Sequence, residues 1–251
     1  MGMDSGVAVL KKTVKLINHI ADNGKAIGVS ELSKELKIPK ATVHRILNTL
    51  CGDNVILKTE EGLYRLGPTV LLWSDGFHLA SGIVEMAQPY LKQLCDVSKE
   101  TVHLCVYEHG CAQYAERLNS PQTVVLRWSR LGSALPLYCT AAGRAILASL
   151  PQTELDAYLR DTEMVPRTSF TVTSKEKLKE MLSCFRARGY AEENQENEEN
   201  IRCIGAAILN REGYPVAAVS ITAPSFRFTD YDAGVFGPKV ANVAREISSK
   251  L

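Results

Sequence analysis

The chain has 251 residues, of which 45% are hydrophobic and 23% charged, a composition typical of folded domains that excludes global disorder. Its 29 Lys and Arg residues nearly balance 28 Asp and Glu residues, so the net charge is +1 and any nucleic-acid surface must be a local patch. Seven cysteines, an odd and low number without the paired spacing of a zinc site, indicate a reducing compartment and predict neither a disulfide scaffold nor a bound metal.

The N-terminal segment predicts a helix and not a targeting signal. An acid precedes its first apolar run and lysines lie in the next, the reverse of a signal peptide, and no apolar stretch in the chain reaches the roughly 18 residues of a membrane span. We therefore expect a cytoplasmic protein without membrane contact. Four apolar residues recur with the spacing of one helical face and predict its buried stripe: Val7, Leu10, Val14 and Ile17. Asn23-Gly24 predicts its end.

Two short helices joined by a tight turn come next. Ser30 is a favourable N-cap for the first helix, and Pro39 limits how far that helix runs. The second helix, from Lys40 to about Cys51, has an apolar inner face of Val43, Ile46, Leu47 and Leu50, and an outward stripe of Ala41, His44, Arg45 and Asn48. This arrangement is typical of a helix-turn-helix.

A hairpin is predicted directly after these helices. VILKT and LYRLG are strand-like runs separated by Glu60, Glu61 and Gly62, and a three-residue loop ending in glycine suits a hairpin. As a wing, it would let Lys58 and Arg65 reach phosphates while the preceding helix enters a major groove about 12 Å wide. The alternatives are a helical bundle with a solvated polar face and a helix-turn-helix that binds only protein.

The run from Ser30 through IPKATVHRILNTL to GLYRLG resembles the winged head of the IclR-type bacterial transcription regulators. The resemblance implies double-stranded operator DNA as a partner and a head domain over residues 1–67. With the wing included, the predicted DNA-binding residues are Lys40, Thr42, Val43, His44, Arg45, Asn48, Lys58, Tyr64 and Arg65. Periodicity alone turns Val43 inward.

Residues 68–80 predict a linker helix. Pro68 suits the first turn of a helix, and the segment is apolar on more than one side through Leu71, Leu72 and Trp73. Such a helix either packs within its own chain or meets its copy in a second subunit. Symmetric half-sites on DNA favour the second arrangement, so we expect a dimer or tetramer.

Residues 81–251 mix helices and strands, and their fold class is predicted to be α+β with one antiparallel sheet. Strands are predicted at 101–108, 111–118, 123–130, 190–195, 201–210 and 215–223. Helices are predicted at 82–98 with an interruption at Pro89, at 141–150, at 153–159, at 174–188 with a Thr173 and Glu176 capping box, and at 230–249.

This half also resembles the IclR-type proteins, whose effector-binding domain is GAF-like. The resemblance lies in three segments: LPLYCTAAGRAILASL, GYAEENQENEENIRCIGAAILN and VAAVSITAPSFRFT. It extends over nearly the whole chain, from about Leu10 to Ile247. Three positions depart from the family pattern: Glu193 stands where Asp or Ser is usual, Asn200 where Gly is common, and Leu209 where an aromatic residue is usual.

A ligand pocket is predicted around the helix that follows Thr140. Thr140 is a natural N-cap, so the amides of Ala141, Ala142 and Gly143 would point out of a helix start where they can bind a carboxylate. An ordinary capped helix packed on the sheet is the alternative. The family is known for binding small carboxylates at this segment, so the resemblance favours the ligand site.

Strand register predicts the rest of this pocket. If Asn210 faces Pro215 across a four-residue connection, Cys203 faces Thr222 and Gly205 faces Ser220 on one side of the sheet. By resemblance, the pocket residues are Glu193, Cys203, Ser220 and Thr222, suited to a sugar acid or a short hydroxy or keto acid. Trp128 is either a pocket wall or a core aromatic.

The leading hypothesis is a transcription regulator of IclR type, expected to be a repressor that responds to a small organic acid. No GxSxG, GxGxxG or Walker motif occurs in the chain, so we expect neither an enzyme nor a cofactor. One rival is a thiol enzyme with Cys203 as nucleophile, which would need His103 or His109 as a base. Another is a protein-interaction scaffold that does not bind DNA.

Overall fold

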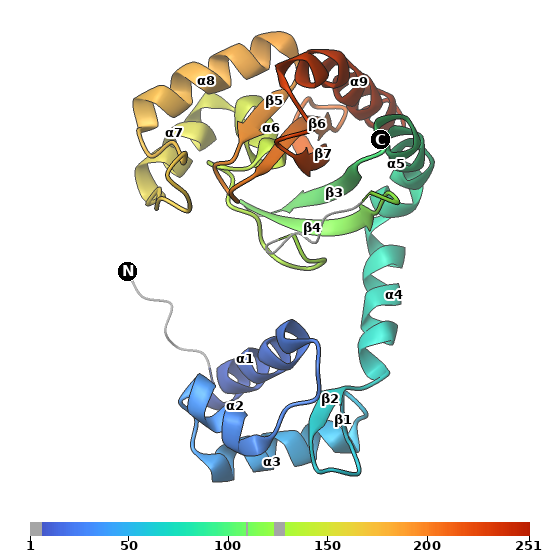
Figure 1. Cartoon of the computed structure of the whole chain (residues 1–251), viewed down its shortest axis with the longest axis vertical. Helices are drawn as coiled ribbons and strands as arrows, with labels where there is room; N and C mark the ends of the chain where they lie inside the picture. The colour runs from blue at the N-terminus through green and yellow to red at the C-terminus, as the bar shows by residue number, and fades with distance from the viewer. Residues whose placement is uncertain (1–6, 109, 123–128) are drawn as a thin grey trace. The chain divides into compact units, whose positions relative to one another are not determined.

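The computed structural model describes residues 7–108, 110–122 and 129–251, with the backbone alone over 77–81. The chain folds as two compact units, Met1–Ser81 and Gly82–Leu251 (Figure 1). The predicted α+β class is confirmed, with helix-turn-helix elements in unit 1 and an antiparallel sheet in unit 2. Among the described helices, none is both long and apolar enough to cross a membrane.

Unit 1 has a three-helix head, a two-stranded wing and a linker helix. Its elements are α1 (Ala8–Asn23), α2 (Val29–Leu36), α3 (Lys40–Gly52), β1 (Ile56–Lys58), β2 (Tyr64–Leu66) and α4 (Thr69–Ser81). α1 ends at Gly24, whose φ is 64°, and the wing turns at Gly62, whose φ is 78°. Both glycines adopt the left-handed conformation that glycine tolerates best, as the sequence predicts.

Two predictions about the head are wrong in detail. The buried face of α1 is formed by Leu16 and Ile20, whereas Val7, Leu10 and Val14 are 61%, 61% and 56% exposed. α1 carries apolar residues on two faces, and only one of them packs on α2 and β2. α2 begins at Val29 with Gly28 as its N-cap, so Ser30 lies inside the first turn.

Unit 2 is a five-stranded antiparallel sheet between two layers of helices. Its elements are α5 (Ile83–Ser98), β3 (Thr101–Glu108), β4 (Cys111–Leu118), α6 (Ala141–Ser149), α7 (Gln152–Asp161), α8 (Lys175–Arg188), β5 (Ala191–Asn194), β6 (Ile201–Leu209), β7 (Pro215–Pro224) and α9 (Asp230–Ser248). The strand order is β4-β3-β7-β6-β5. α5 and α9 cover one face of the sheet, and α6 to α8 lie on the other (Figure 1).

Local sequence signals fail at two places in unit 2, and a third lies mostly outside the described residues. α5 runs through Pro89 without interruption, because buried residues on both sides of the proline hold the helix in the core. The N-cap of α8 is Ser174, whose Oγ accepts a bond from the Lys177 amide at 3.2 Å, so the cap predicted at Thr173 is one residue early. The strand predicted at 123–130 lies mostly outside the described residues.

The predicted register of β6 and β7 is confirmed. Cys203 pairs with Thr222 and Gly205 pairs with Ser220. The expected pairing of Asn210 with Pro215 is wrong, because a bulge next to Ile208 brings Leu209 opposite Pro215. The body of the hairpin keeps the register that places its small and polar residues together.

Candidate functional site

Helix α3 presents the polar face that the sequence predicts. Lys40, His44, Arg45 and Asn48 are exposed, and Thr42 is half-buried. The turn before α3 is fixed by the Ser33 hydroxyl, which donates to the carbonyl of Ile38 at 2.7 Å. The helix therefore offers its charged and amide side chains from a rigid support.

His44 and Asn48 lie one turn apart and contact each other. The amide nitrogen of Asn48 is 3.2 Å from Nδ1 of His44. Because this amide nitrogen can only donate, Nδ1 accepts, and the neutral ring carries its proton on Nε2. An Nε2 donor can bond to an acceptor on a base edge in the major groove.

Two of the predicted DNA-binding residues are wrong. Val43 is 0% exposed and Tyr64 is 1% exposed, so neither side chain can reach DNA. Val43 packs in the head core, as periodicity alone indicates. Tyr64 is buried because its backbone forms a bridge with Ile27, which turns the ring into the same core.

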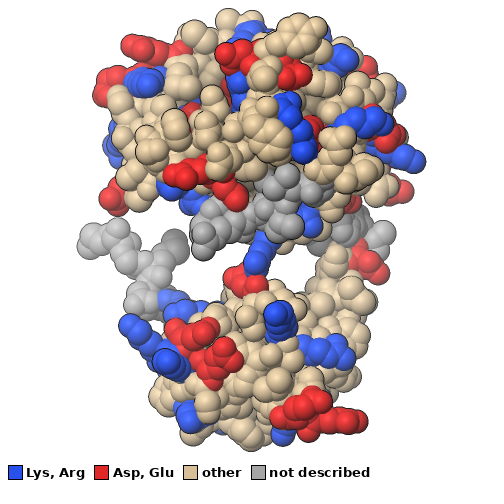
Figure 2. Space-filling model, viewed as in Figure 1, with Lys and Arg blue, Asp and Glu red and all other residues tan. Residues whose placement is uncertain are grey.

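The wing keeps its two predicted cations on the surface. Lys58 and Arg65 are both exposed, and Nζ of Lys58 lies 5.9 Å from the centre of the Tyr64 ring. On the face drawn in Figure 2, acidic and basic side chains are interspersed and no single-sign field covers either unit. The basic surface of the head is therefore local, as the net charge of +1 requires.

In unit 2, the start of α6 meets the sheet at a glycine. The hydroxyl of Thr140 accepts a bond from the Gly143 amide at 3.2 Å, which confirms the predicted N-cap. The amides of Ala141 and Ala142 are in the first turn and have no partner within the helix. A Cβ on Gly205 would lie 2.7 Å from the nitrogen of Ala142, so glycine is needed for this close approach.

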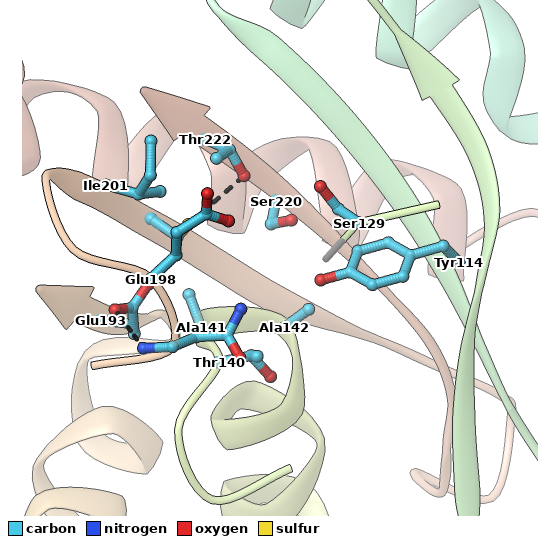
Figure 3. Close-up of a pocket in the computed structure, with 12 residues that line it drawn as sticks. Tyr114, Ser129, Thr140, Ala141, Ala142, Glu193, Glu198, Ile201, Ser220 and Thr222 are labelled. Atoms are coloured by element: carbon cyan, nitrogen blue, oxygen red, sulfur yellow. Dashed lines mark hydrogen bonds between the residues drawn. The ribbon is translucent and has the colours of Figure 1, made fainter. Parts of the chain in front are cut away.

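A small cavity of about 20 Å³ lies at this point (Figure 3). Seven predicted residues line it: Thr140, Ala141, Ala142, Glu193, Cys203, Ser220 and Thr222. Five further lining residues were not predicted: Tyr114, Ser129, Asn197, Glu198 and Ile201. The cavity holds about one water molecule in this state.

Two other residues that the sequence predicts for the pocket are not among those that line the cavity. Gly143 does not line the cavity, because its amide is already bonded to Thr140 and its Cα faces the backbone of Leu137. A Cβ on Gly143 would lie 2.4 Å from the Leu137 Cα, so this glycine has a packing role. Trp128 lies outside the described residues.

A row of hydrogen-bonding side chains extends from the cavity into the sheet. Sγ of Cys203 donates to the hydroxyl of Thr222 at 3.3 Å, and that hydroxyl lies 3.3 Å from Nδ1 of His103. The ring of His103 packs edge-on against Tyr114. Burial, and then the charge of Arg117, lowers the pKa of His103 to about 3, so this histidine is neutral.

This arrangement does not activate the Cys203 thiol. Burial, followed by the nearby Glu193 carboxylate, raises the pKa of Cys203 well above its usual value, which keeps the thiol protonated. His103 bonds to Thr222 and not to the sulfur, and His109 lies outside the described residues. In the part of the chain that the structure describes, no three His, Cys, Asp or Glu residues form a metal-binding group.

Residues 195–200, here called the pocket loop, close the cavity. The loop connects β5 to β6 and contributes Asn197 and Glu198 to the lining. The Glu193 carboxylate accepts bonds from the loop amides of Glu196 and, at 3.2 Å, Asn197. Burial raises the pKa of Glu193 to about 7, although these two amides favour its charged form.

Backbone conformation explains one departure from the family pattern. Asn200, at the end of the pocket loop, has a φ of 63°. This is the left-handed region that glycine prefers and that asparagine tolerates better than most residues. The asparagine therefore preserves the turn into β6.

A buried ion pair anchors the pocket loop to α6. The Arg144 guanidinium is 0% exposed and forms two bonds with the Glu196 carboxylate, at 2.5 and 2.6 Å. Glu196 also accepts from the amide of Val172, and Arg144 donates to the carbonyls of Tyr138 and Glu192. Sequence reasoning missed this pair, although an arginine inside an alanine-rich helix was a visible signal.

Comparisons with known proteins agree with both halves of this description. Residues 79–249 match the family described as bacterial transcriptional regulator IclR C-terminal, and residues 9–53 match the IclR helix-turn-helix domain. The HTH-type transcriptional regulator KipR of Bacillus subtilis is 32% identical over 90% of both chains. The transcriptional repressor IclR of Escherichia coli is 28% identical over 96% of this chain and 89% of its own. The crystal structure of Thermotoga maritima IclR has a TM-score of 0.83 at 31% identity, covering 97% of this chain and 98% of that one.

Proposed function

Because the chain belongs to the IclR family of bacterial transcriptional regulators, we propose that it is a repressor whose operator binding responds to a small carboxylate in the unit 2 pocket. Members of this family bind DNA. The protein would therefore act in the cytoplasm, because bacterial operator DNA is located there. The observation that carries the effector proposal is the meeting of unpaired α6 amides with the hydroxyls of Ser220 and Thr222 in one cavity.

For DNA recognition, we assign the base contacts to the exposed face of α3. The Arg45 guanidinium can donate two hydrogen bonds to the O6 and N7 atoms of one guanine. His44 can donate a hydrogen bond to a base edge, and the Asn48 amide can both donate and accept. Lys40, Lys58 and Arg65 would neutralise phosphates, which supplies affinity without sequence preference. Thr42 would lie at the border of the interface, because it is half-buried.

For the effector, a carboxylate would bind the amides of Ala141 and Ala142, where the α6 dipole also favours negative charge. A hydroxyl or keto group on the same molecule would then face Ser220 and Thr222. A solved IclR homolog from Microbacterium hydrocarbonoxydans, similar in fold with a TM-score of 0.79 at 20% identity, is complexed with 4-hydroxybenzoate. That ligand carries both functional groups, which supports a hydroxy acid as the class to test first.

The size of the cavity adds a requirement to this proposal. A cavity of about 20 Å³ cannot hold an organic acid, so part of its lining must move when the effector binds, and we assign this movement to the pocket loop. The effector shifts the protein toward the open arrangement only as far as its affinity for the two arrangements differs. A coupling of about 1 to 3 kcal/mol would change operator affinity roughly 5- to 150-fold.

We also propose that the protein acts as a dimer or tetramer. Leu71, Leu72 and Trp73 of α4 are 67%, 71% and 52% exposed, so packing within unit 1 does not cover them. A second copy would cover these residues and give the symmetry that paired half-sites require. Sedimentation velocity of the wild type and of Trp73→Asp tests this proposal. We expect the wild type to be oligomeric and the variant to be monomeric.

A gel-shift experiment with the gene's own upstream DNA tests the regulator proposal. The wild type should shift this DNA, Arg45→Ala should not, and an acid found in a thermal-shift screen should change the apparent affinity. The screen should include 4-hydroxybenzoate, glyoxylate and pyruvate, with Ser220→Ala as the variant expected to lose the response. A protein that shifts no DNA would be a protein-interaction scaffold, and the proposal would be wrong.

A further inference from the structure

A second and larger cavity lies at the other end of α6. It is a groove of about 550 Å³ between the C-terminal ends of α6 and α8 and the side of α9. The groove shares no lining residue with the effector pocket. Its volume is within the range of about 300 to 1,000 Å³ that small-molecule sites occupy.

Three arginines line this groove, and none of its described lining residues is acidic. Arg188 is already engaged, because its guanidinium pairs with Glu192 at 2.9 Å and stacks on Tyr190. Arg186 donates to the carbonyls of Ala148 and Leu150, which leaves part of its fork of five N–H groups unused. Within the described part of the chain, the bonds of the Arg245 guanidinium are two long ones of 3.4 Å, both to atoms of its own helix. The groove therefore has a surplus of positive charge with available donors.

Apart from the arginines, the lining is mostly small and apolar. Alanines from α6, α8, β6 and α9 contribute to it, including Ala187 and Ala207. These methyl groups offer a surface on which an aliphatic or aromatic body can pack. Charge and apolar surface thus lie side by side within one cavity.

The sheet edge adds backbone groups to the groove. β5 begins at Ala191, opposite Gly205, so among the described residues no strand pairs with positions 206–209 of β6 on that side. The amide of Leu209 points away from β7 and bonds to Ser248 of α9 at 2.9 Å. Because peptide groups alternate along an antiparallel strand, the N–H and C=O of Ala207 point to the same open side. One backbone donor and one acceptor are therefore available beside the arginines.

We propose that this groove is a second ligand site, which binds an amphiphilic organic anion. The acidic group would pair with Arg245 and the free part of Arg186, and its apolar body would lie on the alanines. Charge-assisted bonds to guanidinium groups would provide the strongest contacts. The proposal is independent of the effector pocket, because the two sites share no residue.

The fluorescent probe 8-anilinonaphthalene-1-sulfonate tests this site in the full-length protein. We expect one saturable site, and we expect N-phenyl-1-naphthylamine, which lacks the sulfonate, to bind at least about tenfold more weakly. Arg245→Gln should weaken the sulfonate probe about fivefold or more, since it removes one charge-assisted contact. Ala187→Trp should abolish binding, because Ala187 is exposed and a large ring there fills the groove.

Two variants serve as controls for this experiment. Arg211→Gln removes an exposed arginine outside the groove, and Ser220→Ala alters only the effector pocket. Both should leave probe affinity within about twofold of wild type, as distant sites behave independently. Arg245 is exposed, so its variant remains informative even if Ala187→Trp does not fold. The proposal is overturned if neither groove variant changes binding, if the uncharged probe binds equally well, or if no saturable binding occurs.

Discussion

The outer face of α3 and the effector pocket present their polar groups in opposite ways. On α3, Arg45 and Lys40 are exposed and lie on a helix whose turn is fixed by Ser33. In the pocket, the Glu193 and Thr222 side chains are buried and already bonded to protein groups. A rigid partner such as a DNA duplex can meet side chains that are exposed in advance. A small molecule must instead replace contacts that the protein makes with itself.

The largest expected effect comes from the anchor of the pocket loop. Arg144→Met should lower the free energy of unfolding of unit 2 by about 3 to 5 kcal/mol, because Glu196 is left charged and unpaired in the interior. Urea unfolding followed by circular dichroism measures this change. Changing both partners, as Arg144→Met with Glu196→Met, should restore much of the stability.

Lys179→Met is the matched control for this experiment. Lys179 pairs with Asp156 at 2.9 Å, and both side chains are about half exposed. Since exposed ion pairs contribute little, this variant should unfold like the wild type. Equal effects of the two variants would show that the buried pair is not an anchor.

The next effect should appear on the DNA side of the comparison. Arg45→Ala should weaken operator binding by about 5- to 150-fold and relax selectivity at one base pair, as expected for loss of a two-bond contact with guanine. Fluorescence anisotropy with labelled operator measures it, and Arg211→Ala, at an exposed position in unit 2, is the control. A uniform loss across all sequences would instead indicate that Arg45 contacts phosphate.

Protonation of Glu193 gives a prediction for the pocket. Burial raises the pKa of Glu193 to about 7, so the folded state holds a proton that the unfolded state releases near pH 4.5. The contribution of protonated Glu193 to the free energy of unfolding is therefore fully present below about pH 4.5. It is lost as the pH rises from about 4.5 to 7. A carboxylate effector should also bind more weakly above pH 7, by at most about tenfold per pH unit, because charged Glu193 repels it.

Isothermal titration calorimetry with an acid identified in the thermal-shift screen checks this pH dependence. Glu193→Gln should flatten the profile between pH 6 and 8, because it removes the titrating group. A profile that stays steep in Glu193→Gln would assign the proton to another residue.

The smallest expected effect concerns the wing. Lys58→Ala should weaken binding to all DNA sequences by a similar factor and reduce the slope of log affinity against log salt by about one. Binding measured at several salt concentrations on operator and unrelated DNA checks it. A change confined to the operator would mean that Lys58 reads sequence.

The sequence predicts the elements of both regions but only part of their contacts. In the head, the 3.6-residue period separates Val43 from Arg45 correctly, because one face of α3 packs on a core. The same period fails for α1, because this helix has two apolar faces. The sequence does not show which of them packs against the core of the head. Register likewise places Cys203 opposite Thr222, since the period of a strand is fixed.

Pocket residues that depend on distant segments could not be predicted. Tyr114 reaches the cavity from β4, whose register against β3 shifts between Leu104 and Cys105. Glu196 pairs with an arginine 52 positions away, and no local pattern shows that one acid in an acidic run has this role. The tertiary fold supplies these contacts.

Gly205 limits how the effector preference of this protein can be altered. Any side chain at this position collides with the start of α6, which moves the very amides that we assign to the carboxylate. Ser220 and Thr222 already carry side chains that line the cavity, so we expect that polarity can be exchanged there while the helix stays in place. Engineering of a biosensor from this scaffold should therefore diversify the β7 positions and leave the glycine unchanged.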